Sequence, residues 1–287
     1  MSRARILALA GATALLSTAT FAALSTETLA ADLPPPLPPP VYRPAVVEAS
    51  GWYLRGFVGM SNQFLSDIHH PSFDTAPQFT FLDKGGFESG IFVGGGIGYA
   101  WNNWLRFDVT GEYRGKVGFS ALDRFFNPFV GPGVFMTNDY RATKSEWVVL
   151  VNGYFDLGTW WCVTPFIGAG VGVAQNRIEH FRDTNVIAGG GGWADAGTKS
   201  NLAWALYAGA SYKVTSNFAI DLSYRYLNLG KAETGLLVNL DPTFSSGNPL
   251  NPVTFNNIQS HDLMLGMRWL LQSEPPPAYP PPLMRKG

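Results

Sequence analysis

The stretch WLRFDVTGEYR, residues 104–114, places its charged side chains at a spacing of two. Successive side chains of an extended strand point to opposite faces, so Arg106, Asp108, Glu112 and Arg114 share one face. The other face carries only leucine, phenylalanine, valine, glycine and tyrosine. Guanidiniums and carboxylates at this spacing can line a polar pore or gate, or they can neutralise one another as ion pairs. Either role requires the charged face to lie inside the fold.

The same alternation recurs along the chain. The expected strands cover residues 51–60, 87–101, 104–114, 143–157, 163–177, 200–213, 218–227 and 258–271. The short connections are 102–103, 158–161 and 214–217, and the long ones are about 63–86, 116–141, 178–198 and 229–257. Short turns on one rim, long loops on the other and an even number of strands are typical of a bacterial outer-membrane barrel. Each segment reaches the roughly 9–11 residues that cross a bilayer at a tilt.

Between their first and last apolar residues, the apolar faces of these strands carry no charged residue. Tryptophans gather at strand ends beside the short turns, as at Trp101, Trp104 and Trp160, where rings are expected to meet lipid headgroups. A soluble β-sandwich also alternates, but its core would not accept so many charges. The sequence therefore predicts an all-β fold, an eight-stranded antiparallel transmembrane β-barrel built as an up-and-down meander with short periplasmic turns and four long extracellular loops. Ten strands remain an alternative, because a long loop could contain another hairpin.

In such a barrel the charged faces point into the lumen. The inward-facing charged residues are Arg55, Glu88, Arg106, Asp108, Glu112, Arg114, Glu146, Asp156, Lys213, Asp221, Arg225, Asp262 and Arg268. Eight strands leave an interior just wide enough for side chains, and the two signs are nearly balanced, which favours a structural salt-bridge network. Inward-facing glycines such as Gly94 and Gly168 leave local room, so a pore-lining role stays open.

The N-terminus predicts export. Arg3 and Arg5 precede an apolar stretch and the small residues TLAAD, a pattern typical of a signal peptide cleaved after Ala30 or Ala31. Proline-rich runs flank the expected barrel and favour extended linkers. The predicted parts are a signal peptide over 1–31, a proline-rich periplasmic segment over 32–50, the outer-membrane barrel over 51–271 and a proline-rich tail over 272–287.

The glycine runs and the histidines are two further groups of residues that could bind a ligand. The runs GGGIG and GAGVG do not open a helix, so small lumen-facing residues explain them better than nucleotide binding does. The four histidines, His69, His70, His180 and His261, fall in or near the long-loop rim, where a haem or metal site would be conceivable, but ordinary loop histidines are the simpler interpretation. No nucleophile, base and orienting group form a recognisable triad. We therefore predict no enzyme, catalytic residue, cofactor or metal site.

Residues 121–135, ALDRFFNPFVGPGVF, are rich in phenylalanine for a solvent loop. They predict either a partner surface or strands that extend beyond the membrane and pack these rings on themselves. The single cysteine, Cys162, excludes an intrachain disulfide, and the net charge of -1 gives no indication of nucleic-acid binding.

Several motifs resemble the small outer-membrane β-barrels of alphaproteobacteria, surface antigens and porin-like proteins of the OmpA-like barrel superfamily. The stretches that carry the resemblance are GWYLRGFVGMS, GGGIGYAWNNWLRFDVTGEYR, NGYFDLGTWWCVTPFIGAGVGVA and FAIDLSYRYLNLG. The resemblance implies an outer-membrane location, antigenic surface loops and insertion by the outer-membrane assembly machinery. Such barrels often end on an aromatic residue, a role that Trp269 could fill, although a proline-rich tail follows it here.

The function expected from these observations is that of a structural, surface-exposed barrel that supports envelope integrity and contact with the surroundings. The alternatives are a narrow porin for ions or small solutes and a surface receptor for haem or another ligand. The expected partners are outer-membrane lipids and lipopolysaccharide, the assembly machinery, and peptidoglycan or a periplasmic protein through the proline-rich ends.

Overall fold

A computed structural model describes residues 50–127, 130–187, 189–240 and 251–271. The chain divides into two compact units, 1–45 and 46–287, and all of the described residues belong to the second. The predicted signal peptide, the proline-rich segment before Ser50 and the tail over 272–287 lie outside the described residues.

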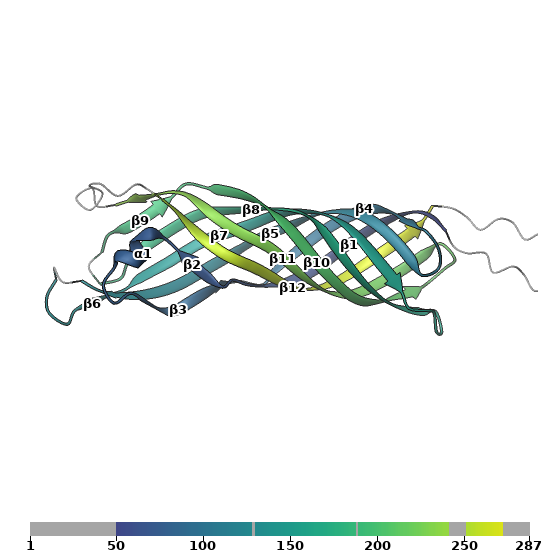
Figure 1. The fold of residues 1–287 in the computed structure, drawn as a ribbon, viewed down its shortest axis with the longest axis horizontal. Coiled ribbons are helices and arrows are strands. Elements are labelled where there is room, and N and C mark those ends of the chain that lie inside the picture. The colour runs from purple at the N-terminus through teal and green to yellow at the C-terminus, as the bar shows by residue number, and fades with distance from the viewer. Residues whose placement is uncertain (1–49, 128–129, 188, 241–250, 272–287) are drawn as a thin grey trace, which may run out of the picture. The chain divides into compact units, whose positions relative to one another are not determined.

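Long antiparallel strands close into a barrel (Figure 1). In order around the described barrel they are β1 (Gly51–Phe64), β4 (Gly90–Ala100), β5 (Leu105–Phe126), β7 (Asn138–Asp156), β8 (Val163–Asn185), β10 (Gly197–Lys213), β11 (Phe218–Asn239) and β12 (Pro252–Leu270). Each strand pairs with the next, and β12 pairs back onto β1, with Arg55 opposite Arg268. The closed antiparallel barrel predicted from the sequence is confirmed, and closure leaves its long strands without a free edge.

Five short elements gather at the end of the barrel away from the short turns (Figure 1). They are β2 (Asp67–His69), α1 (Pro71–Thr75), β3 (Thr80–Phe87), β6 (Phe135–Met136) and β9 (Gly191–Ala194). Because short turns face the periplasm in barrels of this kind, we expect these elements at the extracellular end, and the two ends of the barrel are named accordingly below. No helix among the described residues is long and apolar enough to cross a membrane.

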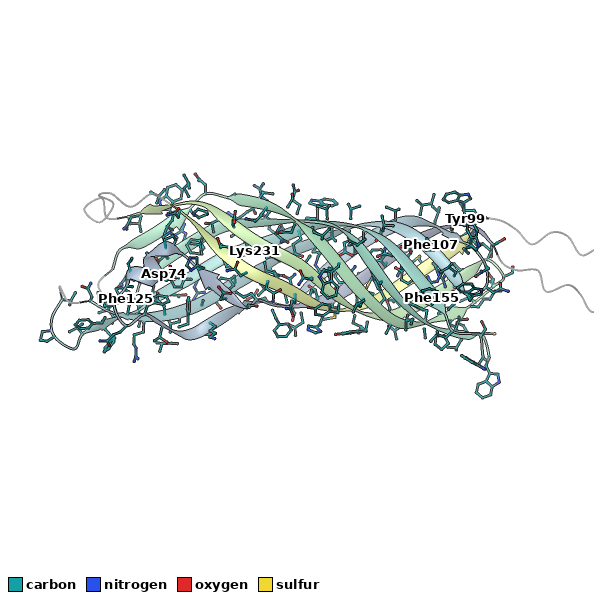
Figure 2. The ribbon with its side chains drawn as sticks, in the orientation of Figure 1. Asp74, Tyr99, Phe107, Phe125, Phe155 and Lys231 are labelled. Atoms are coloured by element: carbon teal, nitrogen blue, oxygen red, sulfur yellow. The ribbon has the colours of Figure 1, made fainter. Side chains whose placement is uncertain are left out.

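The side-chain alternation follows the sequence pattern closely through the membrane-spanning part. On β5, Phe107 and Val109 are exposed on the outer face, whereas Arg106 and Asp108 are buried inside. Phe107, Phe155 and Tyr99 project from the outer surface near the short-turn end (Figure 2). An apolar exterior around a charged interior is the arrangement that a lipid environment stabilises, because lipid cannot solvate charge.

The expected extents of the long loops are wrong. Strand β5 continues to Phe126 and β7 begins at Asn138, so most of the segment 116–141 is strand. Strands β8, β10, β11 and β12 likewise run into the segments 178–198 and 229–257. In the phenylalanine-rich segment, Phe125 and Phe126 belong to β5, and Phe126 packs on Phe135 with ring centroids 5.9 Å apart.

Register shifts explain why the strands predicted from the alternation are shorter than the strands of the structure. The inward series on β5 uses even positions up to Arg114 and odd positions from Val117, and its pairing with β7 shifts between these two residues. Comparable changes on β8, β11 and β12 lie beside His180, Gly230 and Asn257, each of which has a positive φ. A bulge of this kind inserts an extra residue and reverses which face each later side chain occupies.

Candidate functional site in the barrel interior

A four-residue cluster of charges crosses the middle of the lumen. The guanidinium of Arg225 on β11 donates to both carboxylate oxygens of Glu112 at 2.7 and 2.8 Å. It also donates to Asp262 at 2.8 Å from Nε. Arg114 on β5 donates to the two oxygens of Asp262 at 2.9 Å each. All four side chains are buried, and paired, multiply hydrogen-bonded ions are the arrangement in which buried charge is tolerated.

A third cation extends this cluster toward the extracellular end. Arg114 Nε lies 2.8 Å from a carboxylate oxygen of Glu146, whose other oxygen accepts from the ammonium of Lys144. The Lys144 ammonium also donates to Gln63 Oε1 at 2.8 Å. With Lys144 included, three cations face three anions, so the cluster as a whole carries no net charge.

Three separate ion pairs occupy the periplasmic half of the lumen. Arg55 contacts Asp108 at 3.0 Å, and Asn152 donates to the other oxygen of that aspartate at 2.7 Å. The other two pairs are Arg106 with Asp156 at 3.1 Å and Arg268 with Asp221 at 3.0 Å. Charge therefore balances pair by pair in this half as well.

Aromatic rings fill the space between the ion pairs. The guanidinium of Arg106 lies 4.4 Å from the ring centroid of Tyr154 and 4.6 Å from that of Phe166. The guanidiniums of Arg114 and Arg225 both lie over the ring of Phe92, at 4.7 and 4.9 Å from its centroid. Such contacts give each buried cation an additional favourable partner.

The lumen-facing glycines do not leave an open channel. A Cβ placed on Gly94 would lie 2.5 Å from the ring of Phe57, and one on Gly98 would lie 2.3 Å from the ring of Tyr53. On β8, Gly168 is covered in the same way by Tyr154. These positions are glycine because a large side chain from the neighbouring strand occupies the space.

An apolar layer lies next to the charge cluster on its extracellular side. Phe119 packs on Phe87 and Phe255 with ring centroids 5.2 and 5.0 Å apart, and all three are buried. The ammonium of Lys144 lies 4.8 Å from the centroid of Phe87, so this layer rests directly on the ion pairs. On the periplasmic side, a mouth cavity of about 210 Å³ is lined by residues that include Arg106, Lys213 and Arg268.

Eleven of the thirteen predicted lumen residues take part in these pairs, and two do not. Glu88 is exposed, because it lies between the end of β3 and the start of β4, outside the alternating series, and it accepts from the amide of Gly118 at 3.3 Å. Its predicted inward position is wrong. Lys213 ends β10 at the periplasmic rim and is exposed to the mouth cavity rather than enclosed by the lumen.

Sequence reasoning missed Lys144. The residue lies two positions before Glu146 on the same strand, so the alternation alone could have placed it inside. The four histidines do not come together: His261 contacts the Tyr224 hydroxyl at 2.5 Å, and His69 lies 3.8 Å from Asp74. Across the described ranges, no three His, Cys, Asp or Glu side chains are grouped closely enough to bind a metal ion.

A closed barrel with an apolar belt and a charged interior defines an integral outer-membrane β-barrel protein. The chain belongs to the family described as the outer membrane protein beta-barrel domain, whose model matches residues 12–267. It is therefore located in the outer membrane.

The chain is also similar to several named proteins. The outer membrane protein PagN of Salmonella typhimurium is 31% identical over 187 residues, covering 63% of this chain and 72% of PagN. A candidate adhesin of Rickettsia prowazekii is 27% identical over 180 residues, covering 61% of this chain and 71% of that protein. The crystal structure of Neisserial surface protein A is 20% identical with a TM-score of 0.42, covering 77% of this chain and 97% of the other.

Proposed function

We propose that this protein is a non-conducting structural barrel that strengthens the outer membrane and presents its extracellular end for contact with the surroundings. The observation that carries the proposal is the filled lumen. The three ion pairs of the periplasmic half, the central cluster and the layer of Phe87, Phe119 and Phe255 follow one another along the interior. Eight strands enclose little more space than such side chains need.

The extracellular half supports the surface part of the proposal. Strand β5 has 22 residues and β8 has 23, about twice the roughly 9–11 that a bilayer requires. The extra length carries a strand-built platform beyond the membrane, with polar outer residues such as Lys116 and Arg141. The names of PagN and of the Rickettsia relative, an outer-membrane protein and a candidate adhesin, are in keeping with contact at the cell surface.

The narrow-porin alternative has less support. It rested on the polar interior and on space beside the lumen glycines, but the polar groups pair with one another and aromatic rings occupy that space. We likewise propose a structural and binding role rather than catalysis. Lipids and lipopolysaccharide around the apolar belt, the assembly machinery, and peptidoglycan at the periplasmic end are the partners that fit this role.

Single-channel recording of the refolded barrel in a planar bilayer tests the sealed lumen. We expect no conductance from protein that is shown to be folded by its different gel mobility before and after boiling. Stable, salt-dependent current steps that change in Arg106→Ala or Glu112→Ala would instead establish a porin.

The surface role is tested separately on cells. Bacteria that display the barrel should adhere to host cells or coated surfaces more than the same strain without it. Lys116 and Arg141 are charged residues on the outer face of the extracellular platform. A variant with both changed to Ala tests whether this platform makes the contact. Equal adherence of cells with and without the barrel would argue against a role in surface contact.

A further inference from the structure

The extracellular end of the barrel contains a cavity of about 520 Å³. Its lining comes from the extended parts of β5, β7, β8, β11 and β12, together with β6, β9 and the segment around α1. Figure 2 shows Phe125, one of the lining residues, at the opposite end of the barrel from Tyr99. Cavities of about 300–1,000 Å³ are typical of small-molecule sites.

Aromatic rings form one wall of the cavity. Phe73 and Phe79 stack with their ring centroids 4.6 Å apart and an interplanar angle of 11°. Phe73 also meets the ring of Tyr140 at 5.9 Å, and Phe125 and Met136 line the cavity nearby. This wall offers ring faces and a thioether to an apolar ligand, and ring faces also attract cations.

Two carboxylates supply the charge of the cavity. Asp123 on β5 is fully buried, and it accepts from the Tyr140 hydroxyl at 2.6 Å and from the backbone amide of Asn138 at 2.8 Å. Asp183 on β8 also lines the cavity, and its Oδ1 is buried without a hydrogen-bond partner among the described residues. A buried polar atom that lacks a partner is costly, so a donor in the cavity would be favoured at this position.

No positively charged side chain of the described chain pairs with Asp123 or Asp183 in the cavity. Lysine and arginine are absent from the described lining of the cavity. The one lining histidine is His70, and burial lowers its pKa, so it is neutral at pH 7. The cavity therefore has acceptor oxygens and negative charge beside aromatic rings, with no internal counter-ion.

We propose that this cavity binds a small organic cation, a protonated amine on an aromatic or aliphatic body, with the ammonium at Asp183 and the body against Phe73, Phe79 and Phe125. A divalent metal ion fits less well, because such ions require more oxygen ligands than the unpartnered Oδ1 of Asp183 supplies. This proposal adds a class of ligand to the proposed function. It rests on the proposed function, which places the cavity at the cell surface.

The pH should control this binding. Burial, followed by the charge of Asp123, raises the pKa of Asp183 to about 7. The other titratable groups at the cavity are Tyr140, which stays neutral, and His70. Asp183 is thus largely protonated at pH 5.5 and ionised at pH 8, so an ammonium ligand should bind more tightly at the higher pH.

Calorimetric titration of the full-length mature protein in lipid nanodiscs, with 2-phenylethylamine as the probe, tests the proposal. We expect binding at pH 8 that is at least tenfold weaker at pH 5.5. We also expect 2-phenylethanol, which has the same body without the charge, to bind at least tenfold more weakly than the amine at pH 8. Equal affinities for the amine and the alcohol, or no heat from the amine at millimolar concentration, would overturn the proposal.

Two variants locate the site. Asp183→Asn keeps the shape and removes the charge, so it should weaken the amine at least tenfold and leave the alcohol unchanged. Asp139→Asn is the matched control, because Asp139 is on β7 near the same rim, pairs with Arg141 and does not line the cavity. Its affinity for the amine should equal that of the unchanged protein.

The outcome can be separated from that of the proposed function. Folding of each variant is checked by gel mobility before and after boiling, and Phe79→Ala provides a second way to weaken the site if Asp183→Asn does not fold. Loss of amine binding in Asp139→Asn but not in Asp183→Asn would overturn the assignment. Conductance, or equal adherence of cells with and without the barrel, would refute the proposed function without affecting the amine titration.

Discussion

Arg114 and Asp262 lie 148 residues apart in the sequence and join two facing parts of the barrel wall through a pair of 2.9 Å hydrogen bonds. Arg114 belongs to β5 and Asp262 to β12, and β4 and β1 separate these strands around the barrel. The contact therefore spans the lumen rather than one strand pair. A two-point contact of this kind fixes the relative position of the two walls, because Arg and carboxylate match in geometry.

Changing Asp262 to Ala should destabilise the barrel strongly. Both Arg114 and Arg225 would lose a carboxylate while remaining buried, and breaking a buried pair in this way costs about 3–5 kcal/mol. Urea unfolding in lipid vesicles, followed by tryptophan fluorescence, measures the free energy of unfolding.

The control for this measurement is Asp139→Ala. Its partner Arg141 is 73% exposed, and an exposed pair contributes about 0–1 kcal/mol. If the two variants lost the same free energy of unfolding, the central cluster would not have the structural importance assigned to it.

The membrane part of the fold could be predicted because lipid imposes a simple rule. From Arg106 to Arg114 every second side chain is charged or polar and buried, and every intervening side chain is apolar or glycine. The inward position of the charged residues therefore followed from spacing alone. The ion-pair partner of each charged residue could not be predicted from spacing. Arg114 contacts Asp262 because closure of the barrel brings their strands together, and no local sequence pattern indicates this contact.

The extracellular half could not be predicted in the same way. On the extracellular side of the apolar belt, the outer side chains contact water and can be polar. The outer and inner faces of each strand therefore differ less in polarity. The register shift between Arg114 and Val117 then reverses the alternation itself. The cavity brings together Asp123 of β5, Asp183 of β8 and Phe73 of α1, which are far apart in the sequence. The spacing of residues along the chain does not predict that these three segments lie close together.

Changing Val151 to Arg should test where the centre of the apolar belt lies. Val151 is exposed on the outer face of β7, four residues from Trp147 and four from Phe155, whose rings lie toward opposite ends of the belt. An arginine at the bilayer midplane costs about 2–4 kcal/mol. The same urea unfolding experiment should show a loss of this size.

Leu236→Arg is the matched comparison for Val151→Arg. Leu236 is 57% exposed, close to the 56% of Val151, but it lies in the extracellular part of β11. Water surrounds that position, so the substitution should change the free energy of unfolding by less than about 1 kcal/mol. A large loss at Leu236 and none at Val151 would show that the belt has been placed at the wrong height.

The extracellular rim should become less stable as the pH rises from about 4 to 7. The raised pKa of Asp183, about 7, means that the folded rim holds a proton in this range that the unfolded rim has released. Stability therefore falls across the window and becomes constant above it. Hydrogen exchange of the amides in 181–185, corrected for its intrinsic pH dependence, should show greater protection at pH 5.5 than at pH 8.

Asp183→Asn should weaken this pH dependence, while Asp123, whose pKa burial also raises, still contributes in the same direction. Asp139→Asn should retain the full dependence. Protection that is independent of pH in the unchanged protein would contradict the raised pKa of Asp183 and the burial of its Oδ1 without a hydrogen-bond partner.

The orientation of the barrel can be tested through its single cysteine. Cys162 is exposed in the short connection between β7 and β8, which lies at the periplasmic end if short turns face the periplasm. A thiol reagent too large to cross the outer membrane should not label it on intact cells. It should label Cys162 once the outer membrane is permeabilised. A second protein, in which Cys162→Ser is combined with Val186→Cys, moves the thiol to an exposed position just beyond β8 at the other end. That protein should be labelled on intact cells, and the reverse pattern for the two proteins would mean that the cavity of Asp123 and Asp183 faces the periplasm.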